Sequence, residues 1–263
     1  MRGEILTLET LVAALEQDVS TLAERMNLQS DAIIINQDKK NAYEEYCHRG
    51  YRIRAYSFAE RGVGLSRNNA LMRAQGDICL FSDEDIVYED GYAERILEAF
   101  RQRPQADMLL FNMEVDAQRA TYHTHREHRI RFYNSGRYPT YSFAIRRERL
   151  HHSNLTFSLL FGGGACYSNG EDSLFLMDCL KKGLRIYALP INIGKEVYRP
   201  STWFDGYNEK FFFDRGVLYR HLYGSFRHLF ALRFLFAHGK TMCHRIPFWE
   251  AYRLMRKGMK EAG

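Results

Sequence analysis

Gly76-Asp77-Ile78-Cys79-Leu80-Phe81-Ser82-Asp83-Glu84-Asp85 is the stretch of the chain that decides its fold. The apolar run from Ile78 to Phe81 predicts a buried strand, and two carboxylates, Asp83 and Asp85, follow it at positions i and i+2. In an extended segment this spacing places both side chains on the same face. Magnesium is typically held by one or two carboxylates together with substrate phosphates, so the pattern predicts a site for a metal–phosphate pair. Taken alone, the same residues fit a strand that runs into an acidic surface turn equally well.

Strands and helices alternate around this stretch, which predicts an α/β domain with a mostly parallel sheet flanked by helices. Strands are expected at 11–15, 32–35, 52–58, 78–81 and 108–111, and helices at 19–26, 65–74, 90–100 and 170–182. Asp18 is a suitable N-cap for the first of these helices. Parallel sheets bind ligands outside the carboxyl ends of their strands, so Asp83 and Asp85 lie where a ligand is expected.

Composition restricts the class of protein. The chain has 263 residues, of which 46% are hydrophobic, so a sizeable core is expected, and it has no run of about 18 apolar residues that would span a membrane. The first residues lack the apolar region and cleavage site of a signal peptide. Five cysteines are scattered without a C-x-x-C pair, which argues against zinc ribbons and disulfide frameworks. A cytoplasmic location is therefore expected.

The net charge of +5 is unevenly distributed. Residues 215–263 carry ten Lys or Arg and only two acidic side chains, and their apolar residues recur at helical spacing. This pattern predicts basic amphipathic helices, which suit an anionic membrane surface. Packing on the rest of the protein, or a dimer contact, explains the same pattern.

Two further clusters of polar residues are candidates for a metal-binding or catalytic site. His123, His125 and His128 have an H-x-H-x-x-H spacing that could ligate a transition metal, although the surrounding arginines favour a solvated basic loop or strand pair. Glu171 and Asp172 begin the helix expected at 170–182, where they either complement the helix dipole or belong to a site. The Gly-rich loop before them favours a site, because glycines let the backbone approach a ligand closely.

Four segments, in this order, resemble a known family. Gly64-Leu65-Ser66-Arg67-Asn68-Asn69-Ala70 is similar to a G-x-x-x-A-R-N-x-G helix, residues 76–85 to a strand that ends in a D-x-D motif, and Gly170-Glu171-Asp172 to an E-D motif. The segment 201–210 is similar to one found in bacterial transferases linked to surface polysaccharides. Together they resemble a family 2-type glycosyltransferase of the GT-A fold over most of residues 11–214. The resemblance implies a GT-A-like catalytic domain at 1–214, followed by a basic amphipathic helical extension at 215–263.

The resemblance also implies an activity. It is the metal-dependent, inverting transfer of a sugar from a nucleotide-diphosphate donor, expected to be a UDP-sugar, to a saccharide or lipid-linked saccharide in surface polysaccharide synthesis. Mn²⁺ or Mg²⁺ would neutralise the diphosphate leaving group. The enzyme would be cytoplasmic, with the inner face of the cell membrane as a further partner, and nucleic acid is not an expected partner.

Site residues follow from the same resemblance. Asp85 would ligate the metal directly and Asp83 would touch metal or ribose, while Asp172 would be the general base, with Glu171 as the other candidate. Donor-binding residues would be Arg67, Asn68, Asp38, Asp83 and Glu84. Acceptor-binding residues would be Gly163, Gly164 and Trp203. A structural role remains open for three of these: a surface ion pair for Arg67, a plain turn for Asp38, and a place in the core for Trp203.

One feature departs from the family pattern: Glu16 ends the first strand, close to where the anionic donor phosphates would lie. Two other functions also remain open. A nucleotidyltransferase also uses a metal at the end of a strand, and a non-catalytic basic protein would bind lipid or RNA through its tail. The second alternative gives no role to the carboxylates Asp83, Asp85 and Asp172.

Overall fold

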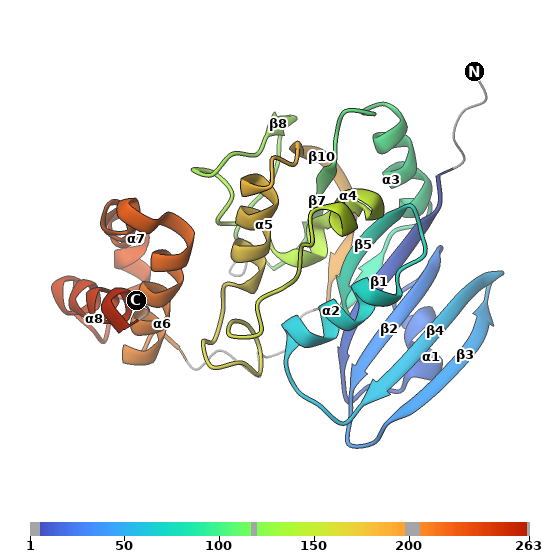
Figure 1. Cartoon of the computed structure of the whole chain (residues 1–263), viewed down its shortest axis with the longest axis horizontal. Coiled ribbons are helices and arrows are strands. Elements are labelled where there is room, and N and C mark those ends of the chain that lie inside the picture. The colour runs from blue at the N-terminus through green and yellow to red at the C-terminus, as the bar shows by residue number, and fades with distance from the viewer. Residues whose placement is uncertain (1–5, 117–119, 198–205, 262–263) are drawn as a thin grey trace.

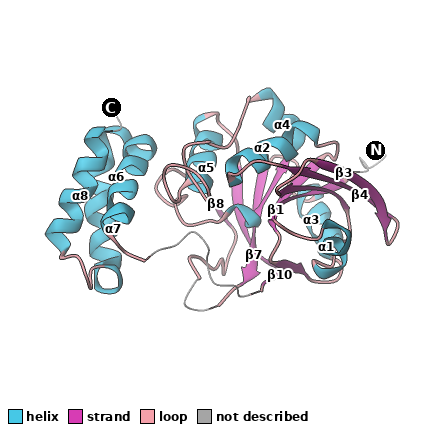
Figure 2. Ribbon diagram, turned by 90° about the horizontal axis from the view of Figure 1, so that it is seen from below, coloured by secondary structure: helices cyan, strands magenta, loops and turns pink. Residues whose placement is uncertain are grey.

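The computed structural model describes residues 6–116, 120–197 and 206–261. In these residues a sheet lies between two layers of helices, and a group of C-terminal helices packs at one side (Figure 1, Figure 2). The strands are β1 (Leu8–Leu15), β2 (Asp31–Gln37), β3 (Ala42–His48), β4 (Tyr51–Phe58), β5 (Ile78–Asp83), β6 (Ile86–Tyr88), β7 (Met108–Glu114), β8 (His128–Arg129), β9 (Phe143–Arg146) and β10 (Ile186–Glu196). The helices are α1 (Val19–Arg25), α2 (Val63–Arg73), α3 (Tyr92–Arg101), η1 (Thr140–Ser142), α4 (Arg147–His152), α5 (Glu171–Lys181), α6 (Glu209–Tyr223), η2 (Gly224–Phe226), α7 (Arg227–Met242) and α8 (Phe248–Glu261).

The strands form one sheet in the order β3-β4-β2-β1-β5-β9-β7-β10-β6, and β8 pairs with β10. Strands β4, β2, β1 and β5 are parallel neighbours, as expected from the alternation of strands and helices. Strand β9 then pairs antiparallel with both β5 and β7. The predicted α/β fold is thus confirmed. Its sheet is mixed, because β9 separates the first parallel group from β7 and β10 and because β3, β6 and β8 also pair antiparallel with their neighbours.

The register of the parallel strands brings their carboxyl ends to one edge. Ala13 of β1 is paired with Asp83 of β5 and with Ile35 of β2, and Leu15 is paired with Gln37. Side chains at the ends of β1, β2 and β5 therefore share one rim of the sheet, although they lie far apart in the sequence.

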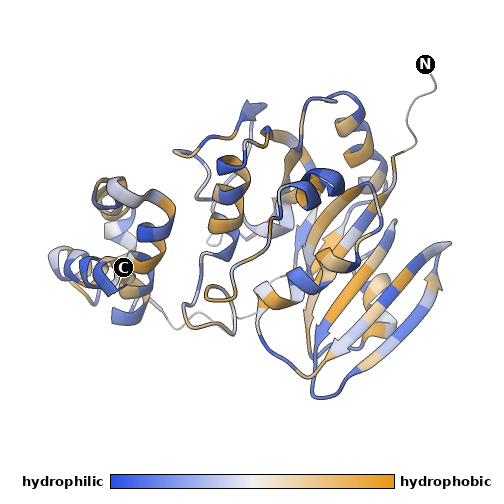
Figure 3. Ribbon diagram, in the orientation of Figure 1, coloured by the Kyte–Doolittle hydropathy of each residue, from blue (hydrophilic) through white to orange (hydrophobic). Residues whose placement is uncertain are grey.

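Each face of the sheet has its own hydrophobic cluster. Helices α1 and α3 cover one face and contribute Leu22 and Phe100, while α2, α4 and α5 cover the other and contribute Leu71 and Phe175 (Figure 2). Figure 3 shows that the apolar residues concentrate in the central strands between these layers. Burying each large apolar side chain contributes about 1.5–3 kcal/mol, so this sandwich is the main source of stability.

Local signals explain where individual elements begin. Asp18 caps α1, since its carboxylate accepts a hydrogen bond of 3.1 Å from the Ser20 N–H, as predicted. The β-branched run Ile33–Ile35 is fully buried within β2, as expected for a strand that is covered on both faces.

The C-terminal helices α6, α7 and α8 form a third hydrophobic cluster, which also includes Phe161, Leu174 and Met177. They therefore pack on α5 and on the loop that precedes it. Asp214 of α6 reinforces this junction, because its buried carboxylate accepts hydrogen bonds of 3.0 Å from both the N–H and the hydroxyl of Ser168. The ammonium group of Lys210 lies 2.6 Å from the same carboxylate.

Two glycines let α6 and α8 approach closely. A Cβ on Gly216 would collide with the backbone oxygen of Met255, and a Cβ on Gly258 would collide with that of Phe213. The predicted boundary between 1–214 and 215–263 falls inside α6, and the division into a catalytic domain and an extension stays a prediction. No helix in the described part of the chain is both long enough and apolar enough to cross a membrane.

Candidate active site

Arg67 links the two acidic motifs of the sequence. It lies on the buried side of α2 with 5% of its side chain exposed. One guanidinium nitrogen donates to Asp83 Oδ1 at 2.9 Å, and the other donates to Glu171 Oε1 at 2.9 Å. Asp83 stands at the carboxyl end of β5 and Glu171 in the first turn of α5, so a single cation joins the end of a strand to the start of a distant helix.

An aromatic platform supports this arginine. The Arg67 Cζ atom lies 5.4 Å from the ring centroid of Phe157, which stacks on Phe175 with centroids 4.0 Å apart. Burial by itself lowers the pKa of Arg67, but the negative charges of Asp83 and Glu171 outweigh it and the net shift is upward. Arg67 is therefore a fixed positive charge, and the surface ion pair considered from the sequence is in fact a buried double ion pair.

The acidic stretch after β5 bends sooner than an extended segment would. The strand ends at Asp83, and Glu84 and Asp85 form a turn. The argument that both aspartates lie on one face of a strand therefore does not hold for Asp85. The Asp85 carbonyl accepts a hydrogen bond of 2.8 Å from Val197 N–H, which ties the turn to the end of β10.

The carboxylates of the acidic turn are candidate ligands for a divalent cation. Within the described ranges, no three His, Cys, Asp or Glu side chains are grouped to hold a metal ion. Asp83 and Asp85 are hard oxygen donors, and a pair of carboxylates fits Mg²⁺ or Mn²⁺ when substrate phosphates complete the coordination. The residues present therefore fit a cation that binds together with a diphosphate.

The histidine motif does not form a metal site in the structure. The rings of His123 and His125 lie 4.6 Å apart, but His128 Nε2 is 2.9 Å from the Tyr138 hydroxyl. His128 lies in β8 (His128–Arg129), which pairs antiparallel with β10.

Two residues near the acidic turn were not expected from the sequence. Burial raises the pKa of Tyr141 well above its usual value, and the charge of Glu196 raises it further. Asp83 and Asp85 add to the same shift, so Tyr141 faces this group of acids. Glu196 ends β10 next to the turn. Recognising 186–196 as a strand would have placed Glu196 at the rim of the sheet.

Glu171 and Asp172 have different surroundings despite being adjacent. Glu171 accepts from Arg67, whereas Asp172 Oδ1 accepts a hydrogen bond of 2.6 Å from its neighbour, the Ser173 N–H. Burial and the nearby charge of Glu171 raise the pKa of Asp172 to about 7. A carboxyl group with such a pKa can take up and release a proton near neutral pH.

The Gly-rich loop packs against this centre. The Gly163 carbonyl accepts a hydrogen bond of 3.0 Å from Val63 N–H at the start of α2. Gly162 has a φ of 104° and lies so close to Glu171 that a Cβ would come within 2.9 Å of the carboxylate. Gly162 thus borders the ion pair of Arg67 and Glu171, and Gly163, one of the predicted acceptor residues, is tied to the start of α2. The acceptor roles of Gly163 and Gly164 stay predictions.

Asp38, one of the residues predicted to bind the donor, lies at the rim formed by the carboxyl ends of β1 and β2. Asp38 follows β2, and its carbonyl accepts a hydrogen bond of 3.0 Å from Arg61. The same Arg61 forms an ion pair of 2.5 Å with Glu16. Arg61, which the sequence analysis did not select, thereby compensates the unexpected negative charge at the end of β1.

Asn68 is used internally. Its amide donates to the Phe157 carbonyl at 2.9 Å and accepts from the Phe157 N–H at 2.7 Å. Through these bonds Asn68 holds the aromatic platform beneath Arg67. Contact between Asn68 and the donor stays a prediction, as it does for Glu84.

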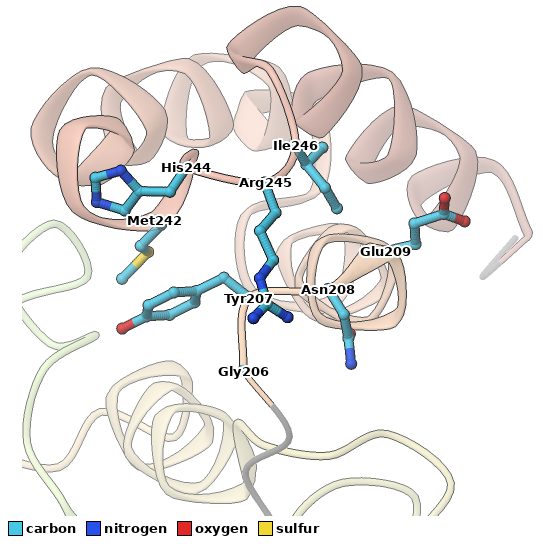
Figure 4. Close-up of a pocket in the computed structure, with 8 residues that line it drawn as sticks. All are labelled: Gly206, Tyr207, Asn208, Glu209, Met242, His244, Arg245 and Ile246. Atoms are coloured by element: carbon cyan, nitrogen blue, oxygen red, sulfur yellow. The ribbon is translucent and has the colours of Figure 1, made fainter.

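Trp203 lies outside the described residues. A cavity of about 500 Å³ occurs nearby along the chain, between the start of α6 and the loop that joins α7 to α8. Figure 4 shows Tyr207 and Arg245 among the side chains that line it. None of the site residues predicted from the sequence lines this cavity.

Comparisons with known proteins give a consistent result. The family model described as Glycosyl transferase family 2 matches residues 7–165. Residues 1–349 of S. aureus TarS in complex with UDP-GlcNAc match with a TM-score of 0.62 and 14% identity, covering 91% of this chain and 74% of that one. The complex of the same TarS fragment with UDP gives a TM-score of 0.59 at 14% identity over the same shares. A search of curated proteins found no significant match.

Proposed function

The chain belongs to glycosyltransferase family 2 and is a glycosyltransferase of the GT-A fold, and we propose that it transfers a sugar from a UDP-sugar to a saccharide or lipid-linked saccharide. In this proposal the reaction inverts the anomeric centre and depends on a divalent metal. The donor class is extended from the TarS structures, which hold UDP-GlcNAc and UDP.

The observation that carries the proposal is the pair of hydrogen bonds from Arg67 to Asp83 and Glu171. Inverting sugar transfer needs the leaving diphosphate and the attacking hydroxyl on opposite sides of one carbon atom, at a fixed separation. A buried guanidinium with five donors in a rigid plane sets such a separation better than a flexible contact would. Arg67 thus positions the donor side and the acceptor side of the site relative to each other.

Asp85 and Asp83 would hold the metal. When bound, Mn²⁺ or Mg²⁺ offsets the negative charge that develops on the diphosphate as the glycosidic bond breaks. At the nucleoside end, Asp38 and Arg61, which are joined by a hydrogen bond, would contact the base and ribose of the donor.

Asp172 serves as the general base in this proposal. Glu171 is held by Arg67, while Asp172 forms no ion pair within the described residues. The Ser173 N–H occupies Oδ1, so Oδ2 is the oxygen that would accept the proton from the acceptor hydroxyl. In this proposal Gly163 and Gly164 would let the acceptor approach the backbone.

The setting of the reaction is part of the proposal. We place the enzyme in the cytoplasm, at or near the inner face of the cell membrane, in the synthesis of a surface polysaccharide. The basic C-terminal helices support this placement, because a lipid-linked acceptor would be presented at an anionic surface.

Product analysis tests the function directly. The protein is incubated with a panel of UDP-sugars and Mn²⁺ together with saccharide acceptors, and release of nucleoside diphosphate is measured. A nucleotidyltransferase would release pyrophosphate instead, and a purely lipid- or RNA-binding protein would release neither. Release of UDP without pyrophosphate, lost in Asp172→Asn and retained in Asp178→Asn, is the expected result.

Asp178 is a suitable control because it lies on the same helix, exposed to solvent and paired with Lys181. If Asp172→Asn transferred sugar at the unaltered rate, the assignment of the base would be wrong.

A further inference from the structure

Helix α7 exposes large apolar side chains on one side. Only Ala231 and Leu235 are buried among its residues. Leu229 and Phe236 are 63% and 74% exposed, and Phe226, just before the helix, is 64% exposed. At 100° per residue these three positions fall within one sector of the helix, opposite the buried pair. A solvated helix has no need of this stripe.

Helix α8 continues the same surface. Its buried residues, which include Ala251 and Met255, face α6, while Trp249 is 69% exposed. Phe248 joins the two helices, since its ring centroid lies 5.1 Å from that of Phe236 and 5.1 Å from that of Trp249. The apolar stripe of α7 therefore runs into the exposed tryptophan of α8.

Positive charge lies along both stripes. Arg233 and Lys240 share the sector of Leu229 and Phe236 on α7. The stripe of Trp249 on α8 also carries three basic residues, Arg253, Arg256 and Lys260. Lys240, Arg256 and Lys260 form no ion pair with any residue in the described part of the chain. The exposed face thus combines apolar and aromatic side chains with uncompensated cations.

We propose that this face of α7 and α8, centred on Leu229, Phe236 and Trp249, binds the surface of an anionic phospholipid bilayer. Aromatic and aliphatic side chains insert at the boundary between headgroups and acyl chains, while Lys and Arg contact the lipid phosphates. Helix α7 has 16 residues and is roughly 24 Å long, so it lies in the membrane plane and does not span it. Figure 1 and Figure 2 both place α8 on the far side of the C-terminal helices from the sheet, where a bilayer can reach it.

The charge distribution favours a bilayer over a second copy of the chain. A symmetric dimer through this face would bring two sets of the same cations together, and like charges oppose association. An anionic bilayer complements those cations and also accepts the apolar stripe. The inference deepens the proposed function and rests on its placement at the membrane, although lipid binding itself needs neither a donor nor an acceptor.

Vesicle sedimentation tests the proposal. The full-length protein is mixed with vesicles of phosphatidylcholine alone or of phosphatidylcholine and phosphatidylglycerol in equal amounts. We expect pelleting with the anionic vesicles that weakens as salt is added. Each basic residue contributes roughly fivefold to such binding, so Arg256→Glu combined with Lys260→Glu should reduce it by at least tenfold.

A second pair of variants tests the apolar part. Leu229→Glu combined with Phe236→Glu should abolish pelleting, whereas Met72→Glu, which alters a residue of α2 that is 70% exposed, should pellet like the parent protein. Thermal unfolding verifies that each variant is folded, and transfer to a soluble acceptor should stay unchanged in the Leu229/Phe236 variant. If the parent protein transferred no sugar but still bound anionic vesicles, the proposed glycosyltransferase function would be contradicted and the proposed lipid binding would not.

The proposal is overturned if the parent protein does not pellet with anionic vesicles. It is also overturned if the Leu229/Phe236 variant pellets as well as the parent protein. It is also overturned if the face binds RNA and no vesicles, or if light scattering shows a dimer that the Leu229/Phe236 variant dissociates without any change in vesicle binding.

Discussion

Arg67 and Glu171 are joined by an ion pair of 2.9 Å across 104 positions of the sequence. This contact gives a physical difference between two adjacent acids, of which the sequence favoured Asp172 as the base and kept Glu171 as the other candidate. Because Glu171 neutralises Arg67, its carboxylate is committed to the protein, and the adjacent Asp172 remains the group that can exchange a proton.

Replacement of the base should remove catalysis while leaving binding intact. Asp172→Asn is expected to lower the rate of transfer by about 10²–10⁴-fold, the usual contribution of general acid–base catalysis. The affinity for UDP, measured by calorimetry, should stay close to that of the parent protein. A large loss of UDP affinity in this variant would assign Asp172 to donor binding.

The pH dependence of transfer should report Asp172. Its pKa is raised to about 7, so the carboxyl is still protonated and inactive as a base below that pH. The transfer rate should therefore rise as the pH increases through about 7. Glu171→Gln removes a negative charge that contributes to the upward shift, and should move the rising limb to lower pH. A limb that stays in place would show that another group is being titrated.

Loss of the buried double ion pair should destabilise the fold. Arg67→Met leaves Asp83 and Glu171 without their cation, and breaking a buried pair in this way costs about 3–5 kcal/mol of unfolding free energy. Denaturant unfolding measures the loss. Arg52→Met breaks the solvent-exposed pair with Glu45 and is the matched control, which should unfold at nearly the same denaturant concentration as the parent protein.

Binding of UDP should depend on a divalent cation. Mn²⁺ and UDP together are expected to raise the melting temperature more than the sum of their separate effects, because a ligand stabilises by RT ln(1 + [L]/Kd). EDTA should remove this increment, and so should Asp85→Asn. If Asp85→Asn kept the full increment, the metal would have to be held elsewhere.

Because α6 and α8 approach each other closely, alanine at two helical glycines should change the free energy of unfolding in opposite directions. Gly258→Ala places a Cβ against the backbone of Phe213 and should destabilise the protein by about 1–3 kcal/mol. Gly239→Ala in α7 meets only Phe248, at 3.5 Å, and should stabilise it by up to about 1 kcal/mol through helix propensity. Equal effects in chemical denaturation would mean that α6 and α8 are not tightly packed.

The sequence was most informative where local chemistry determines the structure. The apolar runs of β2 and β5 and the cap at Asp18 predicted elements that the structure contains. The exposed, polar β3 carries no such pattern and is held by its hairpin with the adjacent β4. The four-residue β9 and β10, which Pro190 interrupts, depend on partners distant in sequence. The antiparallel pairings of β3, β6, β8 and β9 make the sheet mixed.

The candidate site shows the same limit. Motifs identified Arg67, Asp83 and Glu171, but no local pattern reveals that one guanidinium joins both acids. Tyr141 and Glu196 were missed because they reach the acidic turn from elements whose presence was not predicted.

The carboxylate of Asp214 has a consequence for how this enzyme can change. It comes from a C-terminal helix, yet it anchors Ser168 in the loop that leads into α5 and the proposed base Asp172. In a hybrid protein with C-terminal helices from another enzyme, this loop would lose its hydrogen bonds to position 214 unless position 168 were exchanged together with the helices. Helix and loop should therefore be inherited together, and recombination that separates them should produce folded proteins with a misplaced base.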